Sequence, residues 1–154
     1  MQFGGTYRFN APREAVWAAL NSTAILEAAI PGCRRIEWTS PTTLECEIQV
    51  NFGVISPVFM GDLTLSDVTP AVVYTLSGRG RGGMLGKAEA KADIALADAG
   101  ADTILTFTAH GGADGGIMKL GRALLGSSAQ KVIDGFFLRI GRAMAIEVTP
   151  LTPV

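Results

Sequence analysis

Strict alternation of apolar and polar residues in the middle of the chain constrains the fold more than any other feature. From residue 44 to residue 52, five apolar residues alternate with four polar ones: Leu44, Cys46, Ile48, Val50 and Phe52 against Glu45, Glu47, Gln49 and Asn51. A period of two is typical of an antiparallel strand with one face toward the core and one toward water. Similar patterns predict strands near residues 34–39, 57–66, 71–79, 85–97 and 102–110, and the short turns between them favour a meander.

Helical patterns flank this meander. Residues 2–10 alternate as a first strand, and Pro12 then suits the opening turn of a helix. Ser22 can cap a second short helix, which Pro31-Gly32 ends. Apolar residues then recur every three or four positions from about residue 117 to Ile146, which predicts a helix about 45 Å long.

The predicted fold class is therefore α+β. We expect a curved, seven-stranded antiparallel sheet, two short helices after the first strand, and a long C-terminal helix that lies against the sheet. Residues 1–148 are expected to form one ligand-binding domain, and residues 149–154 a disordered tail.

Composition excludes several classes of protein. With 48 % hydrophobic and 18 % charged residues the chain is too apolar for disorder, yet it lacks the roughly 18 consecutive apolar residues of a membrane span. No signal peptide is recognisable, so we expect a cytoplasmic protein in which Cys33 and Cys46 are free thiols. Neither cysteine has metal-ligand spacing, and we expect no metal and no cofactor. An acidic pI of 5.8, without a basic patch among aromatics, argues against nucleic-acid binding.

Small side chains gather where the sheet and the long helix are expected to face each other. Glycine makes up 19 of the 154 residues, and the predicted inner faces of the middle strands carry glycine and alanine. Because interiors are close-packed, such residues either bring helix and sheet into contact or leave a cavity. We favour an apolar ligand cavity. Its candidate ligand-binding residues share the inward face: Trp17, Phe59, Leu63, Tyr74, Leu76, Ala88, Ala90, Leu105, Phe107, Leu125, Ala129, Val132, Ile133 and Phe136.

Catalytic patterns are missing from the sequence. Tyr74 is the main hydroxyl expected on the inner face, and His110 lies on the outward parity, either as a hydrogen-bonded structural histidine or at the cavity mouth. No nucleophile or carboxylate pairs with His110, so we assign no catalytic residue. The glycine-rich run 78–83 joins two strands and opens no helix, which argues against a phosphate-binding loop.

Charge is distributed unevenly. Residues 117–146 carry a net charge of +4 and the remainder −5, because Asp134 alone opposes five basic residues there: Lys119, Arg122, Lys131, Arg139 and Arg142. These cations form either a solvated outer face or a contact with an acidic partner or an anionic membrane. The apolar turn that holds Phe52, Val54 and Ile55 is either covered by neighbouring structure or touches a partner or lipid.

The order of predicted elements resembles the START-like, or SRPBCC, superfamily, whose helix-grip fold encloses an apolar cavity. Within it, the chain is similar to the G-subunit family of carbon monoxide dehydrogenase at residues 1–6, 11–17, 74–80, 120–122 and 136–137, and at Ile30-Pro31-Gly32-Cys33. The resemblance covers residues 1–146. It implies a non-catalytic accessory protein of a molybdenum-containing CO dehydrogenase or a related hydroxylase.

The resemblance also implies partners. They are a hydrophobic small molecule (a quinone or a lipid), subunits of the molybdenum hydroxylase, and the inner face of the cytoplasmic membrane. Longer family members carry a C-terminal membrane-anchoring segment, whereas this sequence ends at Val154, so we expect transient rather than stable membrane contact. The alternative is a small cyclase or hydrolase of the same fold that uses Tyr74 or His110 as acid or base.

Overall fold

The computed structural model describes residues 2–49, 54, 56, 58–81, 87–113 and 129–151. Within these residues, eight strands form one antiparallel sheet in the order β2-β3-β4-β5-β6-β7-β1-β8. The strands are β1 (Gln2–Phe9), β2 (Cys33–Ser40), β3 (Thr43–Gln49), β4 (Val58–Thr69), β5 (Val73–Arg81), β6 (Lys87–Ala99), β7 (Asp102–Ala113) and β8 (Val148–Leu151). The helices are α1 (Arg13–Leu20), α2 (Thr23–Ala29) and α4 (Ala129–Met144). The predicted α+β class with a curved antiparallel sheet is confirmed.

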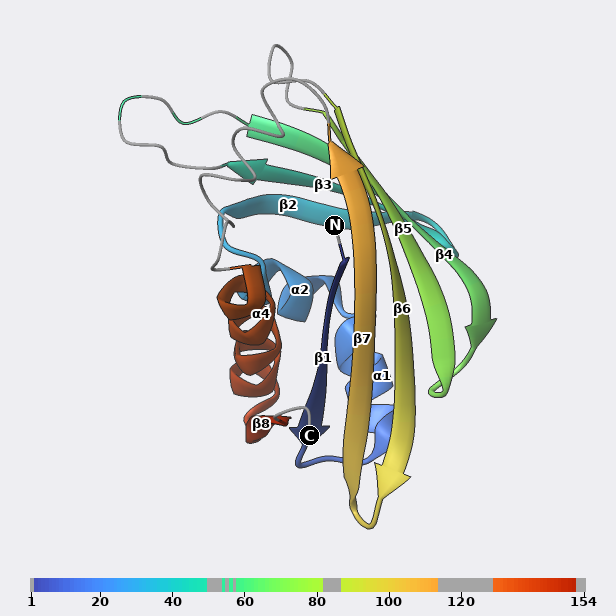
Figure 1. Cartoon of the computed structure of the whole chain (residues 1–154). Helices are drawn as coiled ribbons and strands as arrows, with labels where there is room; N and C mark the ends of the chain where they lie inside the picture. Colours follow the sequence, from blue (N-terminus) through green and yellow to red (C-terminus); the bar gives the residue numbers. More distant parts are fainter. Residues whose placement is uncertain are drawn as a thin grey trace.

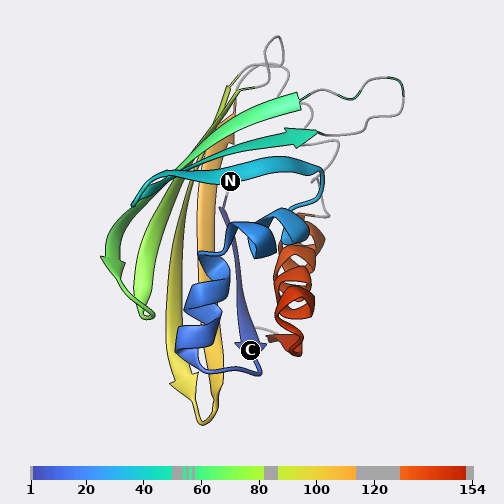
Figure 2. The same ribbon diagram turned by 180° about the vertical axis from the view of Figure 1, so that it is seen from behind.

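The sheet curves strongly and holds the helices on its concave side. Strands β2 and β3 cross the upper part of the molecule at a steep angle to β1, β6 and β7 (Figure 1). From behind, α1 and α2 pass beneath β2, and α4 stands beside β1 (Figure 2). Among the described residues, no helix combines the length and the apolar character needed to cross a bilayer.

Local signals explain the two short helices, both of which were predicted. Pro12 stands in extended conformation directly before α1, and the Ser22 hydroxyl accepts a hydrogen bond from the Ile25 amide at 3.4 Å to open α2. After α2 the chain turns at Gly32, whose φ of 77° lies in the left-handed region that favours glycine. A Cβ atom at Gly32 would lie only 2.1 Å from the Gln49 carbonyl oxygen, so the turn also needs the missing side chain.

Glycines on the inner face of the sheet leave space, and neighbouring side chains occupy part of it. A Cβ atom at Gly61 would lie 2.9 Å from the Cys46 sulfur, and one at Gly78 would lie 3.1 Å from a Leu63 methyl carbon. At Gly80 the nearest atom would be a backbone oxygen at 3.9 Å. These glycines thus permit close packing between neighbouring strands of the sheet at Gly61 and Gly78 and leave more room at Gly80.

The prediction of seven strands is wrong by one, because residues expected to begin a disordered tail form β8. After α4 the chain reverses at Ala145, which has a φ of 60°, and β8 pairs antiparallel with the end of β1. Val148 is buried against Gly141, where a Cβ atom would lie 2.4 Å from a Val148 methyl carbon. Pro150 is tolerated because β8 is an edge strand.

The long C-terminal helix is described only in part. Helix α4 has 16 residues, or about 24 Å, and ends at Met144 rather than at Ile146. The first half of the predicted helix, residues 117–128, lies outside the described residues. Strand β7 continues to Ala113, three residues beyond its predicted end.

Candidate functional site

An apolar cavity of about 110 Å³ lies between the sheet and the helices. Strands β2 to β7 supply one side of it, and α1, the α1–α2 junction, α2 and α4 supply the other. Its lining is apolar except for Asn21 and Tyr74. The complete lining is Leu20, Asn21, Leu26, Ile30, Ile36, Trp38, Leu44, Leu63, Leu65, Tyr74, Leu76, Ile94, Phe107, Phe136 and Phe137. Five of these side chains are aromatic, a composition suited to a flat apolar ring.

Tyr74 is a buried residue that supplies the cavity with a hydroxyl. It lies opposite Ile94 in the β5–β6 register, is 5 % exposed, and its ring meets the edge of Trp17 at a centroid distance of 5.1 Å. Within the described part of the chain, the Tyr74 hydroxyl has no hydrogen-bond partner. Burial raises its pKa well above the usual value of a phenol, so the group stays protonated at neutral pH and can donate a hydrogen bond.

Asn21 is the second polar residue of the lining, and it is engaged in holding the surrounding structure. Its side-chain amide donates to the Trp17 carbonyl at 2.8 Å, and its backbone carbonyl accepts from the Trp38 indole at 3.2 Å. The junction between α1 and α2 thereby orients Trp38 in the cavity wall. Of the two polar residues, Tyr74 is the one whose side chain makes no hydrogen bond to the described part of the protein, so its hydroxyl can donate to a ligand without breaking one.

Phe137 is the centre of an aromatic cluster that closes the cavity beneath α4. It is 3 % exposed, and its ring lies between 4.5 and 6.3 Å, centroid to centroid, from those of Tyr7, Phe9, Phe107 and Phe136. Such contacts join α4 to β1 and β7. The cluster makes this end of the cavity part of the hydrophobic core.

Two hydrogen bonds fix α4 in place, and neither was predicted from the sequence. The Tyr7 hydroxyl donates to Asp134 at 2.6 Å, and the Arg139 guanidinium donates to the Ala29 carbonyl at 2.9 Å. Gly135 leaves room for the Arg139 guanidinium, since a Cβ atom there would lie 3.2 Å from it. Gly135 and Arg139 are four residues apart, about one helical turn, and this spacing is the sequence signal that could have indicated that the Arg139 side chain lies over Gly135.

Five of the predicted ligand-binding residues line the cavity: Leu63, Tyr74, Leu76, Phe107 and Phe136. Trp17 stands behind Tyr74, while Phe59, Ala90, Leu105 and Ile133 are outside the lining. Leu125 and the side chains of Ala88, Ala129 and Val132 lie outside the described part. The prediction missed the residues that α1, α2 and β2 contribute, because the periodicity of short helices does not show which face meets a curved sheet.

The predicted contact residues are placed in part. Val54 is fully exposed and Arg142 is exposed, whereas Arg139 is half-buried in its bond to α2. Phe52, Ile55, Lys119, Arg122 and the side chain of Lys131 are outside the described residues. His110 pairs with Gln2 and Lys91 through the backbone of β7, and its side chain is likewise not described.

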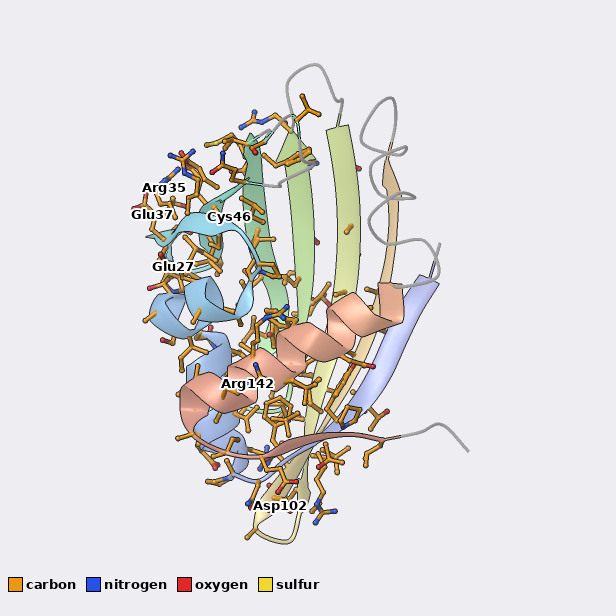
Figure 3. The ribbon with its side chains drawn as sticks, turned by 90° about the vertical axis from the view of Figure 1, so that its left-hand side faces the viewer. Glu27, Arg35, Glu37, Cys46, Asp102 and Arg142 are labelled. Atoms are coloured by element: carbon orange, nitrogen blue, oxygen red, sulfur yellow. The ribbon has the colours of Figure 1, made fainter. Side chains whose placement is uncertain are left out.

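The thiols give no sign of reactivity or of metal binding. Cys46 is buried and Cys33 half-buried, and burial raises the pKa of both thiols, which keeps them protonated. Across the described ranges, no three His, Cys, Asp or Glu side chains gather closely enough to hold a metal ion. Figure 3 shows Cys46 on the upper part of the sheet, away from Asp102 at the lower end.

A second hollow, of about 260 Å³, is polar. It lies where β1, the start of β7 and β8 meet, and its lining is Arg8, Asn10, Asp102, Glu147 and Thr149. Arg8 donates to Asp102 at 2.7 Å and to the Ala99 carbonyl at 3.5 Å. Its one cation is therefore already paired within the protein.

Comparison with known proteins identifies relatives of the whole chain. The family model of CoxG, the G-subunit of carbon monoxide dehydrogenase, matches residues 5–145. No curated protein matches. A conserved protein from Geobacillus kaustophilus has a similar crystal structure, with a TM-score of 0.81, 24 % identity, and coverage of 96 % of this chain and 99 % of that one.

Two more distant structures share the fold. A protein from Chromobacterium violaceum is 12 % identical with a TM-score of 0.72, over 93 % of this chain and 96 % of its own. The ZhuI aromatase/cyclase from a Streptomyces species is 13 % identical with a TM-score of 0.66, over 94 % and 93 %. At these identities the likeness concerns the fold alone, and it agrees with the predicted START-like architecture.

Proposed function

This chain belongs to the CoxG family, the G-subunit family of carbon monoxide dehydrogenase, and from that premise we propose that it is a non-catalytic accessory protein of a molybdenum-containing CO dehydrogenase or a related hydroxylase. In this role it binds a hydrophobic ligand, a quinone or a lipid, between the sheet and the helices. It carries that ligand between the enzyme and the inner face of the cytoplasmic membrane.

The observation that carries this proposal is the Tyr74 hydroxyl, a donor with no partner among the described residues, on a side chain only 5 % exposed in the wall of an otherwise apolar cavity. A ligand oxygen that accepts a hydrogen bond from this hydroxyl would contribute a net of about 0.5–1.5 kcal/mol to binding. A quinone carbonyl offers such an oxygen on a flat, apolar ring.

Cavity size limits what enters it. A cavity of roughly 150 Å³ lined by Leu, Ile and Phe can bind benzene, so 110 Å³ is on the scale of one ring. We therefore place the ring of a quinone against Tyr74, with its apolar tail extending out of the cavity. Each buried Å² of the ligand contributes about 25 cal/mol to binding.

The membrane and enzyme contacts are assigned to the exposed cations and the apolar turn. Arg142 and Val54 are exposed in the described part. Phe52, Ile55, Lys119, Arg122 and Lys131 complete the proposed contact set on the strength of the sequence alone. An anionic membrane attracts each such cation by about 1 kcal/mol.

The test is a titration with a benzoquinone that carries a ten-carbon alkyl tail. Only two tryptophans are present, and Trp38 lines the cavity, so binding should quench its fluorescence. Leu76→Phe fills the cavity and should weaken binding at least tenfold, while the matched Val72→Phe, at an exposed position, should not. Quenching no stronger than that of free tryptophan, with no apolar ligand in native mass spectra after mild purification, would exclude the carrier role.

A small cyclase or hydrolase is the second candidate, because an aromatase/cyclase shares the fold. Tyr74 would act in it as a proton donor, and His110 as acid or base. Turnover of an aromatic polyketide or ester that disappears in Tyr74→Phe or His110→Ala would favour the enzyme over the carrier.

A further inference from the structure

Two hydrogen bonds of α4 bracket the aromatic residues that this helix contributes to the cavity. Asp134 is bound to Tyr7 on β1, and Arg139 is bound to the Ala29 carbonyl at the end of α2. Phe136 and Phe137 lie between these two positions and line the cavity. The position of this wall therefore depends on two polar contacts.

The two contacts differ in what can replace them. The Tyr7–Asp134 bond joins a hydroxyl to a carboxylate, and Tyr7 is 1 % exposed, so an approaching anion gains nothing there. Arg139 is half-buried and donates to a neutral carbonyl. A phosphate is a stronger acceptor for a guanidinium, because the bond is then charge-assisted from both sides and can be bidentate.

Loss of the Arg139 bond would separate two parts of the cavity wall. Ala29 is the last residue of α2, and Leu26 and Ile30 on either side of it line the cavity. The carbonyls at the end of a helix lack partners within the helix, and Arg139 supplies one for Ala29. Arg139 thus joins the α2 wall to the α4 wall.

The neighbouring surface can bring a phosphate to Arg139. Arg142 lies three residues further on α4 and is exposed, so the two guanidinium groups are neighbours on the helix. Figure 3 shows Arg142 on α4, which crosses the open side of the curved sheet. An anionic bilayer that attracts Arg142 places its phosphates next to Arg139.

We propose that Arg139 is a gate residue: an anionic lipid headgroup takes its guanidinium from the Ala29 carbonyl, and α2 and α4 then part to exchange the ligand at the membrane. The inference rests on the proposed function, because it supposes a ligand that moves between the cavity and a bilayer. It adds to that function the place and the trigger of release.

The experiment measures transfer of the decyl-tailed benzoquinone from the protein to vesicles, as recovery of tryptophan fluorescence. For the unaltered protein we expect transfer to be about tenfold faster to phosphatidylcholine vesicles that contain phosphatidylglycerol than to vesicles of phosphatidylcholine alone. A tenfold change in rate corresponds to the loss of about one hydrogen bond to a charged group. Arg139→Met should transfer quickly to both kinds of vesicle. Arg34→Met removes the same charge from β2 and should keep the slow rate with neutral vesicles.

Gly135→Ala keeps the charge but places a Cβ atom 3.2 Å from the guanidinium, so it should accelerate transfer to neutral vesicles in the same direction as Arg139→Met but by less, and it protects the test against a variant that fails to fold. Equal rates to both vesicles in the unaltered protein, or no acceleration by either variant, would overturn the gate. Acceleration by inorganic phosphate alone would overturn the requirement for a lipid surface.

A second readout separates this proposal from the carrier role. Amide hydrogen exchange of residues 23–30 should rise when anionic vesicles are added, and it needs no bound quinone. If the quinone does not bind at all, the carrier role fails. If amide hydrogen exchange in α2 does not change when anionic vesicles are added, the gate is excluded, whether or not the quinone binds.

Discussion

The apolar cavity and the polar hollow, both lined by described residues, differ more in how their polar groups are satisfied than in size. The larger, at 260 Å³, contains an arginine and two acids, but Arg8 is already paired with Asp102 at 2.7 Å. The smaller, at 110 Å³, contains the Tyr74 hydroxyl with no partner in the described part, among aromatic rings. This contrast is why the proposed ligand is assigned to the apolar cavity, because a polar cleft whose groups already bond to one another gains little when a ligand replaces those bonds.

The largest expected effect concerns the wall of the apolar cavity. Phe137→Ala removes the ring at the centre of the aromatic cluster, and truncation of a buried Phe costs about 3–5 kcal/mol of unfolding free energy. Urea unfolding followed by circular dichroism measures it. Val68→Ala, at a side chain 39 % exposed, is the control and should stay within about 0.5 kcal/mol. Similar values for the two variants would mean that the cluster is not core.

The two tyrosines of the chain allow a matched comparison of a bonded and an unbonded hydroxyl. Tyr7→Phe removes a donor from Asp134 and should destabilise the protein by about 1–3 kcal/mol. Tyr74→Phe removes a hydroxyl with no partner in the described residues, so stability should hold or rise while affinity for the decyl-tailed benzoquinone falls about fivefold to tenfold. A stability loss in Tyr74→Phe equal to that in Tyr7→Phe would remove the contrast between the sites.

Sequence periodicity predicted the sheet and the two short helices because alternation and capping are local properties. It could not predict β8, since pairing with β1 depends on the reversal at Ala145 and on the space beside Gly141. The site was predicted in part for the same reason. Alternation placed Leu63, Tyr74 and Leu76 on the inner face, whereas the helix residues that meet them are set by tertiary packing.

Alkaline pH tests the burial of Tyr74 in a different way. Burial raises its pKa in the folded protein above the unfolded value near 10, so the unfolded state releases the proton first as pH rises. The stability that this group contributes is fully present below pH 10 and is lost above it, by up to about 1.4 kcal/mol per pH unit. Urea unfolding between pH 9 and about pH 11 should show a shallower loss in Tyr74→Phe. A slope identical to that of the unaltered protein would contradict the buried, protonated phenol.

The smallest effect is expected in the polar cleft. Asp102→Asn breaks the ion pair with Arg8, whose side chain is 47 % exposed, and an exposed pair contributes only about 0–1 kcal/mol. Since salt screens exposed charges, the difference in unfolding free energy should shrink further at high ionic strength, and quinone affinity should not change. Urea unfolding at low and high NaCl, with the quinone titration beside it, measures both. A loss of quinone affinity in this variant would mean that the two hollows communicate and that the ligand site extends beyond the apolar cavity.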